Sequence, residues 1–307
     1  MSVSEIHALL ALLDDPDDTV YVHVRDQLIS KGNEVLPYVD AEVSKAPDCD
    51  VFMGRLEQLR GDLQRTDTKS AVKHWKNSET PSLWEGVLLV QRATYPEMDL
   101  EAARQDFDQL KRDVWLELND ELTALEQVRI LNHMLYSVRG IESVRRMPHL
   151  ASDALPSWVL KEKKGNPLGL GVLYLCLTEA LNLPLRGVNL PNHFILAYCD
   201  ESHVQERPAA SMQAGILFYV NPFSSGAAIG PSDVADFLSH LDQNETARQW
   251  RPCTSVEIIL RLVQHVAFSL REAGELEREK ELIHSFEPLL SSLEDAEERS
   301  NDHPPIR

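Results

Sequence analysis

The chain has 307 residues, of which 43% are hydrophobic, enough to bury the core of one large domain or of two to three small ones. Its 49 Asp and Glu against 30 Lys and Arg give a net charge of -19, which repels nucleic-acid phosphates and anionic lipids, so we expect neither as a partner. No run of apolar residues approaches the roughly 18 needed to cross a bilayer, and the start of the chain turns acidic too soon for a secretory signal. Four widely spaced cysteines without a CxxC pair suit a reducing compartment, so the composition predicts a cytoplasmic protein.

Residues 1–60 are expected to be helical. Apolar residues recur at helical spacing up to the Asp-rich turn at 14–16, and again from Val20 to Ile29, where Lys31 and Gly32 give a helix-ending signal. The layout resembles one HEAT repeat, whose apolar face must pack against neighbouring helices. Any other helical hairpin would give a similar pattern.

Residues 61–145 are expected to form a helical region that packs on a core. The polar, lysine-containing stretch 61–80 is interpreted as a connection. Three amphipathic helices are then expected over 83–92, 100–118 and 122–138.

Residues 146–230 have a different character and are expected to form that core. Asn166 and Pro167 make a strong helix start, because Asn is a good N-cap and Pro is preorganised for the first helical position. The helix that follows, to Leu181, is apolar nearly all round, which predicts that it is central and buried.

Two short apolar segments after this helix, 193–199 and 215–220, are predicted to be strands joined by a polar loop. An antiparallel pair centred near residue 207 would place His193 opposite Asn221. A histidine oriented by a carboxamide is the base half of a site for thiol-based acyl transfer.

Residues 231–307 return to helical patterns. Two long helices, 255–273 and 275–292, are expected to turn at Gly274 and to resemble a single tetratricopeptide unit, followed by a tail.

Six stretches of the sequence are similar to the SirB-type proteins, a bacterial branch of the transglutaminase-like proteins. They are Leu83–Val90, Tyr95–Asp99, Leu131–Leu135, Gly165–Leu170, Gly187–Phe194 and Tyr219–Phe223. The resemblance implies an α+β fold that is mostly helical. A small papain-like transglutaminase core, made of a central helix and antiparallel strands, would be flanked by HEAT-like and tetratricopeptide-like helices.

The resemblance also implies a catalytic cysteine at the start of the central helix, and this chain has none there. The nucleophile position falls at Pro167 or Gly169, and the SirB-type pattern itself has Ser or Thr near Gly169. Cys176 lies seven to nine residues further on, about 10–13 Å along a helix, too far to substitute. Where the family tends to have Asp, this chain has Asn221, which stabilises an imidazolium less.

The sequence therefore predicts a catalytically inactive protein, in which His193 and Asn221 are a vestigial dyad. It would act as a binding or scaffold module for a protein or peptide, through its helical surfaces and a cleft near His193. The expected cleft residues are Asn166, Pro167, Gly169, Asn189 and Asn192. The alternative is a hydrolase or acyltransferase that uses the dyad with a non-standard nucleophile or water; another is that the chain's own loops fill the cleft.

No cofactor is expected. The histidines show neither HxH nor HExxH spacing, and no GKS or GKT follows the glycines at 165–171.

Overall fold

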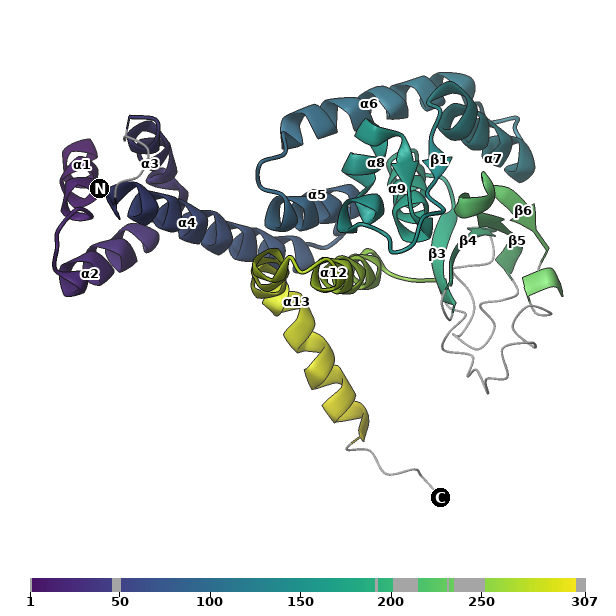
Figure 1. Cartoon of the computed structure of the whole chain (residues 1–307). Coiled ribbons are helices and arrows are strands. Elements are labelled where there is room, and N and C mark those ends of the chain that lie inside the picture. The colour runs from purple at the N-terminus through teal and green to yellow at the C-terminus, as the bar shows by residue number, and fades with distance from the viewer. Residues whose placement is uncertain are drawn as a thin grey trace. The chain divides into compact units, whose positions relative to one another are not determined.

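The structure is a computed structural model. It describes residues 2–45, 51–190, 193–200, 215–230, 232–234 and 252–301, without the side chains of 33, 193 and 292–301. The chain divides into two compact units: residues 1–74 with 284–307, and residues 75–283. Figure 1 shows the elements of each unit.

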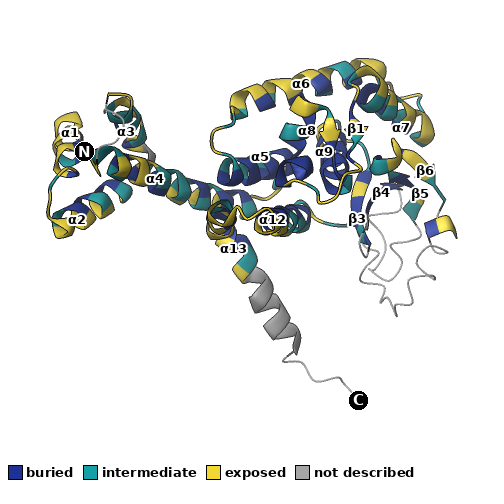
Figure 2. Ribbon diagram, in the orientation of Figure 1, coloured by how far each residue is buried: buried dark blue, intermediate teal, exposed yellow. Residues whose placement is uncertain are grey.

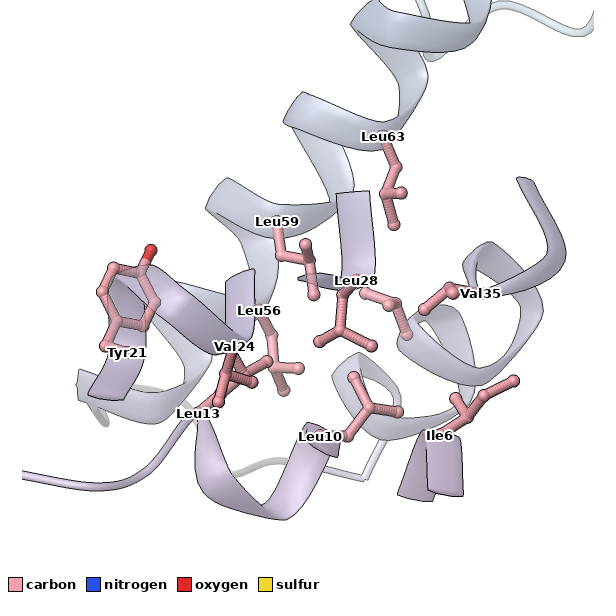
Figure 3. Close-up of a cluster of buried hydrophobic side chains, with 11 residues drawn as sticks. Ile6, Leu10, Leu13, Tyr21, Val24, Leu28, Val35, Leu56, Leu59 and Leu63 are labelled. Atoms are coloured by element: carbon pink, nitrogen blue, oxygen red, sulfur yellow. The ribbon is translucent and has the colours of Figure 1, made fainter. Parts of the chain in front are cut away.

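The first unit is helical. Its elements are α1 (Val3–Leu12), α2 (Asp18–Ile29), the short 3-10 helix η1 (Gly32–Glu34), α3 (Leu36–Val43) and most of α4 (Val51–Lys76). Leucines and valines from these helices converge on one core, drawn in Figure 3 with Leu10, Leu28 and Leu59 near its centre. Because each short helix is amphipathic, none could bury its apolar face alone.

The stretch 61–80, interpreted as a connection, is helical through most of its length, and the boundary between the two units falls within it, at residues 74 and 75. The stretch is polar on one side only: Leu63, Val72 and Trp75 are buried at helical spacing. The lysines and glutamines between them belong to the exposed and half-buried part of the same helix.

The second unit begins with the helices α5 (Leu83–Thr94), α6 (Leu100–Glu117) and α7 (Ala124–Asn132), the last continued by the π-helical segment η2 (His133–Val138). The three predicted amphipathic helices are thereby confirmed. Trp84 of α5 stacks on Phe107 of α6, with ring centroids 4.1 Å apart.

A short parallel pair of strands follows, made of β1 (Glu142–Ser143) and β2 (Lys164–Gly165). Between them lie the 3-10 helix η3 (Ala151–Ala154) and the helix α8 (Pro156–Glu162). The chain leaves β2 directly into α9 (Pro167–Ala180), so this pair positions the start of that helix.

Helix α9 is central, as predicted. Every residue from Leu168 to Thr178 is buried, which colours the helix dark blue in Figure 2. It contacts α5, α6, α8 and the sheet, so its uniformly apolar surface is covered on several sides.

The sheet is antiparallel, in the order β3-β4-β5-β6, and it has two strands more than predicted. Its strands are β3 (Leu185–Leu190), β4 (His193–Cys199), β5 (Ile216–Asn221) and β6 (Ala227–Ile229), with the 3-10 helix η5 (Pro222–Ser224) between the last two. Phe194 of β4 packs so closely on α9 that a Cβ at Gly171 would lie 2.5 Å from its ring. The opposite face carries a second apolar cluster that includes Val188, Ile195 and Tyr219.

The last two helices are α12 (Ser255–Glu272) and α13 (Leu276–Asn301), and Gly274 lies between them with φ +78°. This confirms the predicted helical pair and its glycine turn. Helix α12 packs on α5 and on η3, which brings it close to the start of α9.

Candidate functional site

The first turn of α9 is held by Asn166, which is fully buried. Its side-chain Oδ1 accepts a hydrogen bond from the backbone N–H of Gly169 at 2.8 Å, and its own N–H donates to the carbonyl of Asp153 at 2.9 Å. Asn166 is therefore the N-cap that the sequence predicts, and it also ties α9 to η3.

The other end of the Asn166 amide meets His265 of α12, whose Nε2 lies 2.9 Å from Nδ2. Since Oδ1 must face the Gly169 N–H, Nδ2 is the donor and the imidazole Nε2 the acceptor. Burial, followed by the nearby His149 and Arg261, lowers the pKa of His265 to about 4. The ring is therefore neutral at physiological pH, with its proton on Nδ1.

A buried carboxylate fixes the loop before η3. Asp153 is 4% exposed and accepts two hydrogen bonds from Arg146 Nη2, at 2.7 and 2.9 Å, and one from the N–H of Leu150 at 2.9 Å. These bonds hold the chain from Arg146 to Asp153 in one conformation, next to the start of α9.

A cleft of about 1010 Å³ opens at this end of α9. Its lining residues come from η2, from β1 with the residues just before and after it, from α9, and from η5 with the residue that follows. They are Tyr136, Ile141, Glu142, Ser143, Val144, Arg145, Met147, His149, Pro167, Phe223, Ser224 and Ser225.

Two hydrogen bonds join segments that line the cleft. Ser143 Oγ donates to the carbonyl of Phe223 at 2.6 Å, and Tyr136 OH donates to the carbonyl of Pro222 at 2.8 Å. The walls are thus set by side-chain-to-backbone bonds between segments about 80 residues apart.

One polar atom at the cleft is left unsatisfied by the described residues. His149 Nδ1 is buried and has no hydrogen-bond partner among them. A buried ring nitrogen without a partner costs free energy, so a ligand group that pairs with it would stabilise the complex.

The two candidate nucleophile positions have different surroundings. Pro167 lines the cleft, with a side chain that cannot attack a carbonyl. Gly169 is buried against η3, where an added Cβ would lie 2.4 Å from the carbonyl oxygen of Asp153 and 3.0 Å from backbone atoms of Ala154. Position 169 therefore has no room for any side chain and does not face the cleft.

The predicted pairing of His193 with Asn221 was wrong by two residues. Leu196 lies opposite Val220 and Ala197 opposite Tyr219, and continuing that register brings Ile195, not His193, opposite Asn221. The register shift between Tyr198 and Cys199 accounts for one residue of the error, and the pairing of Cys199 with Ile216, centred half a residue beyond 207, accounts for the other.

Among the described residues, the side chain of Asn221 makes local hydrogen bonds. Its Oδ1 accepts from the N–H of Phe223 at 3.1 Å and its Nδ2 donates to Ser224 Oγ at 3.2 Å, which makes it the cap of η5. The backbone of His193 pairs with Leu190 in the β3–β4 ladder, but its side chain lies outside the described part of the structure.

Asn189, another predicted cleft residue, is not among the residues that line this cleft. Asn189 Oδ1 accepts from Arg261 Nη1 at 2.5 Å, which joins β3 to α12. Asn192 lies outside the described residues.

The cysteines described in the structure offer no activated thiol at the cleft. Burial raises the pKa of Cys176 well above its usual value, and it also raises that of Cys199. Cys253 is half-buried and lines a different pocket, with Arg186 and Ser255. Among the described residues, no three His, Cys, Asp or Glu side chains come together as metal ligands.

Sequence reasoning missed four residues of this region: Ser143, Arg145, His149 and His265. A signal existed for His265 alone, since it stands beside buried Leu262 and Val266 on an otherwise apolar face of its helix. The other three lie in and after a two-residue strand, too short for hydrophobic periodicity to mark.

The central buried helix, the antiparallel sheet against it and the cleft at the helix N-terminus agree with what sequence comparison finds. Residues 101–264 match the transglutaminase-like superfamily. That is more than half of the chain, and the chain belongs to this superfamily.

The curated relatives are distant. A UPF0162 protein of Pseudomonas aeruginosa is 28% identical over 138 residues, which cover 45% of this chain and 51% of that protein. One of Vibrio cholerae is 30% identical over 142 residues, or 46% of this chain and 48% of that protein. Human F-box only protein 21 is 25% identical over 133 residues, 43% of this chain and 20% of its own length.

The chain thus spans about half the length of the two bacterial relatives. No solved structure matches the chain. Within the described residues, no helix is both long and apolar enough to cross a membrane.

Proposed function

We propose that the transglutaminase-like domain of this chain is a non-catalytic binding module, and that the cleft at the start of α9 binds a peptide segment. The observation that carries the proposal is the chemistry of the first turn of α9. Pro167, its residue at the cleft, has no nucleophilic atom, and Gly169 has no space for a side chain. An acyl-transfer enzyme of this superfamily would need a reactive thiol at that place.

The histidines support the same proposal. His265 accepts from Asn166, and its pKa of about 4 makes it a weak base for activating a thiol or water at neutral pH. Asn221 is occupied in capping η5. The described parts of the site therefore serve to hold the helix start and the cleft wall in place.

The cleft has the size and lining of a ligand site. Its volume of about 1010 Å³ lies at the upper end of the range for small-molecule pockets, which leaves room for several residues of an extended chain. Met147 is 77% exposed at its rim, and His149 offers a buried ring nitrogen that no described residue pairs with. Apolar contact and a few placed polar atoms are what peptide recognition uses.

The flanking helices belong to the same proposal as scaffold surfaces. Their HEAT-like and tetratricopeptide-like character, and a SirB-type affiliation, are predictions from sequence. Exposed apolar side chains on the described helices, such as Phe268 at 60% and Leu276 at 51%, offer further contact area.

The experiment is selection of peptides from a displayed library of random linear sequences against the full chain. Bound peptides are then retested on Ser224→Trp, which fills the cleft from an exposed lining position, and on Asn77→Trp, a matched exposed position away from it. We expect peptides that bind the unmodified chain and Asn77→Trp but not Ser224→Trp.

The same protein is assayed for transamidation and hydrolysis of glutamine-containing peptides, with no turnover expected. Turnover that survives removal of trace contaminants would overturn the non-catalytic proposal. Peptides that bind equally to both tryptophan variants, or the absence of any binder, would overturn the assignment of the cleft.

A further inference from the structure

One edge of β1 has no partner strand among the described residues where it borders the cleft. The N–H groups of Glu142 and Val144 donate to Lys163 and Gly165, both at 2.8 Å, so residues 142 and 144 turn their backbone polar groups toward β2. In a strand, successive residues point these groups to opposite edges, so those of Ser143 point away from β2.

The sheet that contains β1 has only two strands in the described part of the chain. Neither the N–H nor the carbonyl of Ser143 has a hydrogen-bond partner among the described residues. The run Ile141–Arg145 lines the cleft without a break, so this unpaired edge borders the open space. Such an edge is a template for an added strand.

The side chains beside this edge are suited to a carboxylate. Arg145 is exposed and has no ion-pair partner in the described structure, unlike its neighbour Arg146, which is paired with Asp153. Glu142, the acidic residue of β1, also lines the cleft, one residue before Ser143 and three before Arg145.

The local charge reverses that of the whole chain. Between residues 139 and 164 there are six Lys or Arg and three Asp or Glu, whereas the chain as a whole carries -19. Arg139 and Arg146 are paired with Asp113 and Asp153, and the cleft lining itself holds one acid, Glu142, and one base, Arg145. The attraction for an acidic segment therefore comes from Arg145.

We propose that the cleft binds an extended, acidic peptide segment as a third strand on the free edge of β1, with a peptide carboxylate paired to Arg145. This inference rests on the proposed function, because it names the ligand class and binding mode of the same cleft. The Ser143 backbone supplies two hydrogen bonds that are independent of sequence, and Arg145 supplies the preference for an acid.

The experiment uses the peptides selected by binding to the full chain and measures their dissociation constants by calorimetry. The selected peptides are expected to share an Asp or Glu at one position. Replacing Arg145 (Arg145→Gln) should weaken binding about three- to tenfold and should remove most of its dependence on salt. The matched control Arg186→Gln changes an exposed arginine of β3 outside the cleft and should leave binding unchanged.

The strand geometry is tested on the peptide itself. Methylation of one backbone nitrogen at a time should weaken binding about tenfold at alternate positions, since a strand pairs every second residue with its neighbour. Each methylated peptide that still binds should also bind Arg145→Gln more weakly than it binds the unmodified chain.

The outcomes separate the two proposals. Peptides that are lost on Ser224→Trp, but show no acidic position and no alternating effect of methylation, would overturn this inference and leave the binding cleft standing. Peptides that bind Ser224→Trp normally would overturn both.

Discussion

The side-chain amide of Asn166 joins the start of α9 to His265 of α12, a residue 99 positions later, through one hydrogen bond of 2.9 Å. Its carbonyl end is used by the N–H of Gly169, so the orientation of the amide is fixed by the helix it caps. The bond therefore holds α12 against the helix start that borders the cleft, and it selects the neutral form of the imidazole.

Removal of the Asn166 side chain should destabilise the protein by about 2–4 kcal/mol, because both the cap and the partner of a buried ring nitrogen are lost. Urea unfolding of Asn166→Ala measures this. The control Thr123→Ala removes the exposed N-cap of α7 and should cost about 1 kcal/mol. Equal losses in the two variants would contradict the role of the His265 bond.

The variant Asn166→Asp keeps the helix cap and changes the charge of the group that faces His265. A carboxylate can still accept from the Gly169 N–H, and its charge favours the imidazolium, so the pKa of His265 should rise from about 4. A titration followed by NMR of the imidazole measures the pKa. An unchanged pKa would mean that the side chain of residue 166 does not face His265.

The free energy of unfolding should decrease in acid because of the lowered pKa of His265. Its pKa in the folded protein is about 4, below the usual 6.5, so the unfolded chain takes up the proton first. The stabilisation is therefore complete above about pH 6.5 and decreases as the pH falls toward 4, by about 3 kcal/mol.

Urea unfolding over this pH range, compared with that of His265→Gln, isolates the contribution, because glutamine can accept from Asn166 without titrating. The difference between the two stability profiles should shrink as the pH falls. Parallel profiles would show that His265 does not change its pKa on folding.

A side chain at position 169 should be strongly destabilising. Gly169→Ala places a Cβ 2.4 Å from the Asp153 carbonyl, and backbone atoms cannot move aside as a flexible side chain can. We expect a loss of about 1–3 kcal/mol by thermal unfolding.

The matched control is Gly54→Ala, in α4, where no atom lies within 4 Å of the added Cβ. It should stabilise its helix by about 0.5–1 kcal/mol. If Gly169→Ala were as stable as the parent protein, position 169 could hold a side chain, and the argument against a nucleophile there would fail.

Arg146 should matter for both stability and binding. Arg146→Ala leaves the Asp153 carboxylate, 4% exposed, without its charged partner, which should cost about 1–3 kcal/mol. The exposed pair of Lys280 and Glu277 is the control, and Lys280→Ala should leave the stability nearly unchanged.

Peptide binding to Arg146→Ala should also weaken, because the segment from Met147 to His149 borders the cleft. Calorimetry with the selected peptides measures this. Unchanged affinity would indicate that the loop keeps its conformation without Asp153.

The sequence alone determined those features whose signals are local. The N-cap at Asn166, the uniformly apolar run of α9 and the glycine between α12 and α13 depend on neighbours within a few residues, and all three are as expected. The sequence also showed that Pro167 is no nucleophile, since a residue type is known without a structure. Superfamily membership followed from short motifs of the same kind.

The tertiary structure decided what depends on distant segments. The register of β4 on β5, which includes an irregularity that no spacing rule anticipates, brings Ile195 rather than His193 opposite Asn221. The crowding at Gly169 comes from η3, and the partner of Asn166 comes from α12. Such contacts depend on how helices and strands pack against each other. The helix and strand propensities of single residues do not predict that packing.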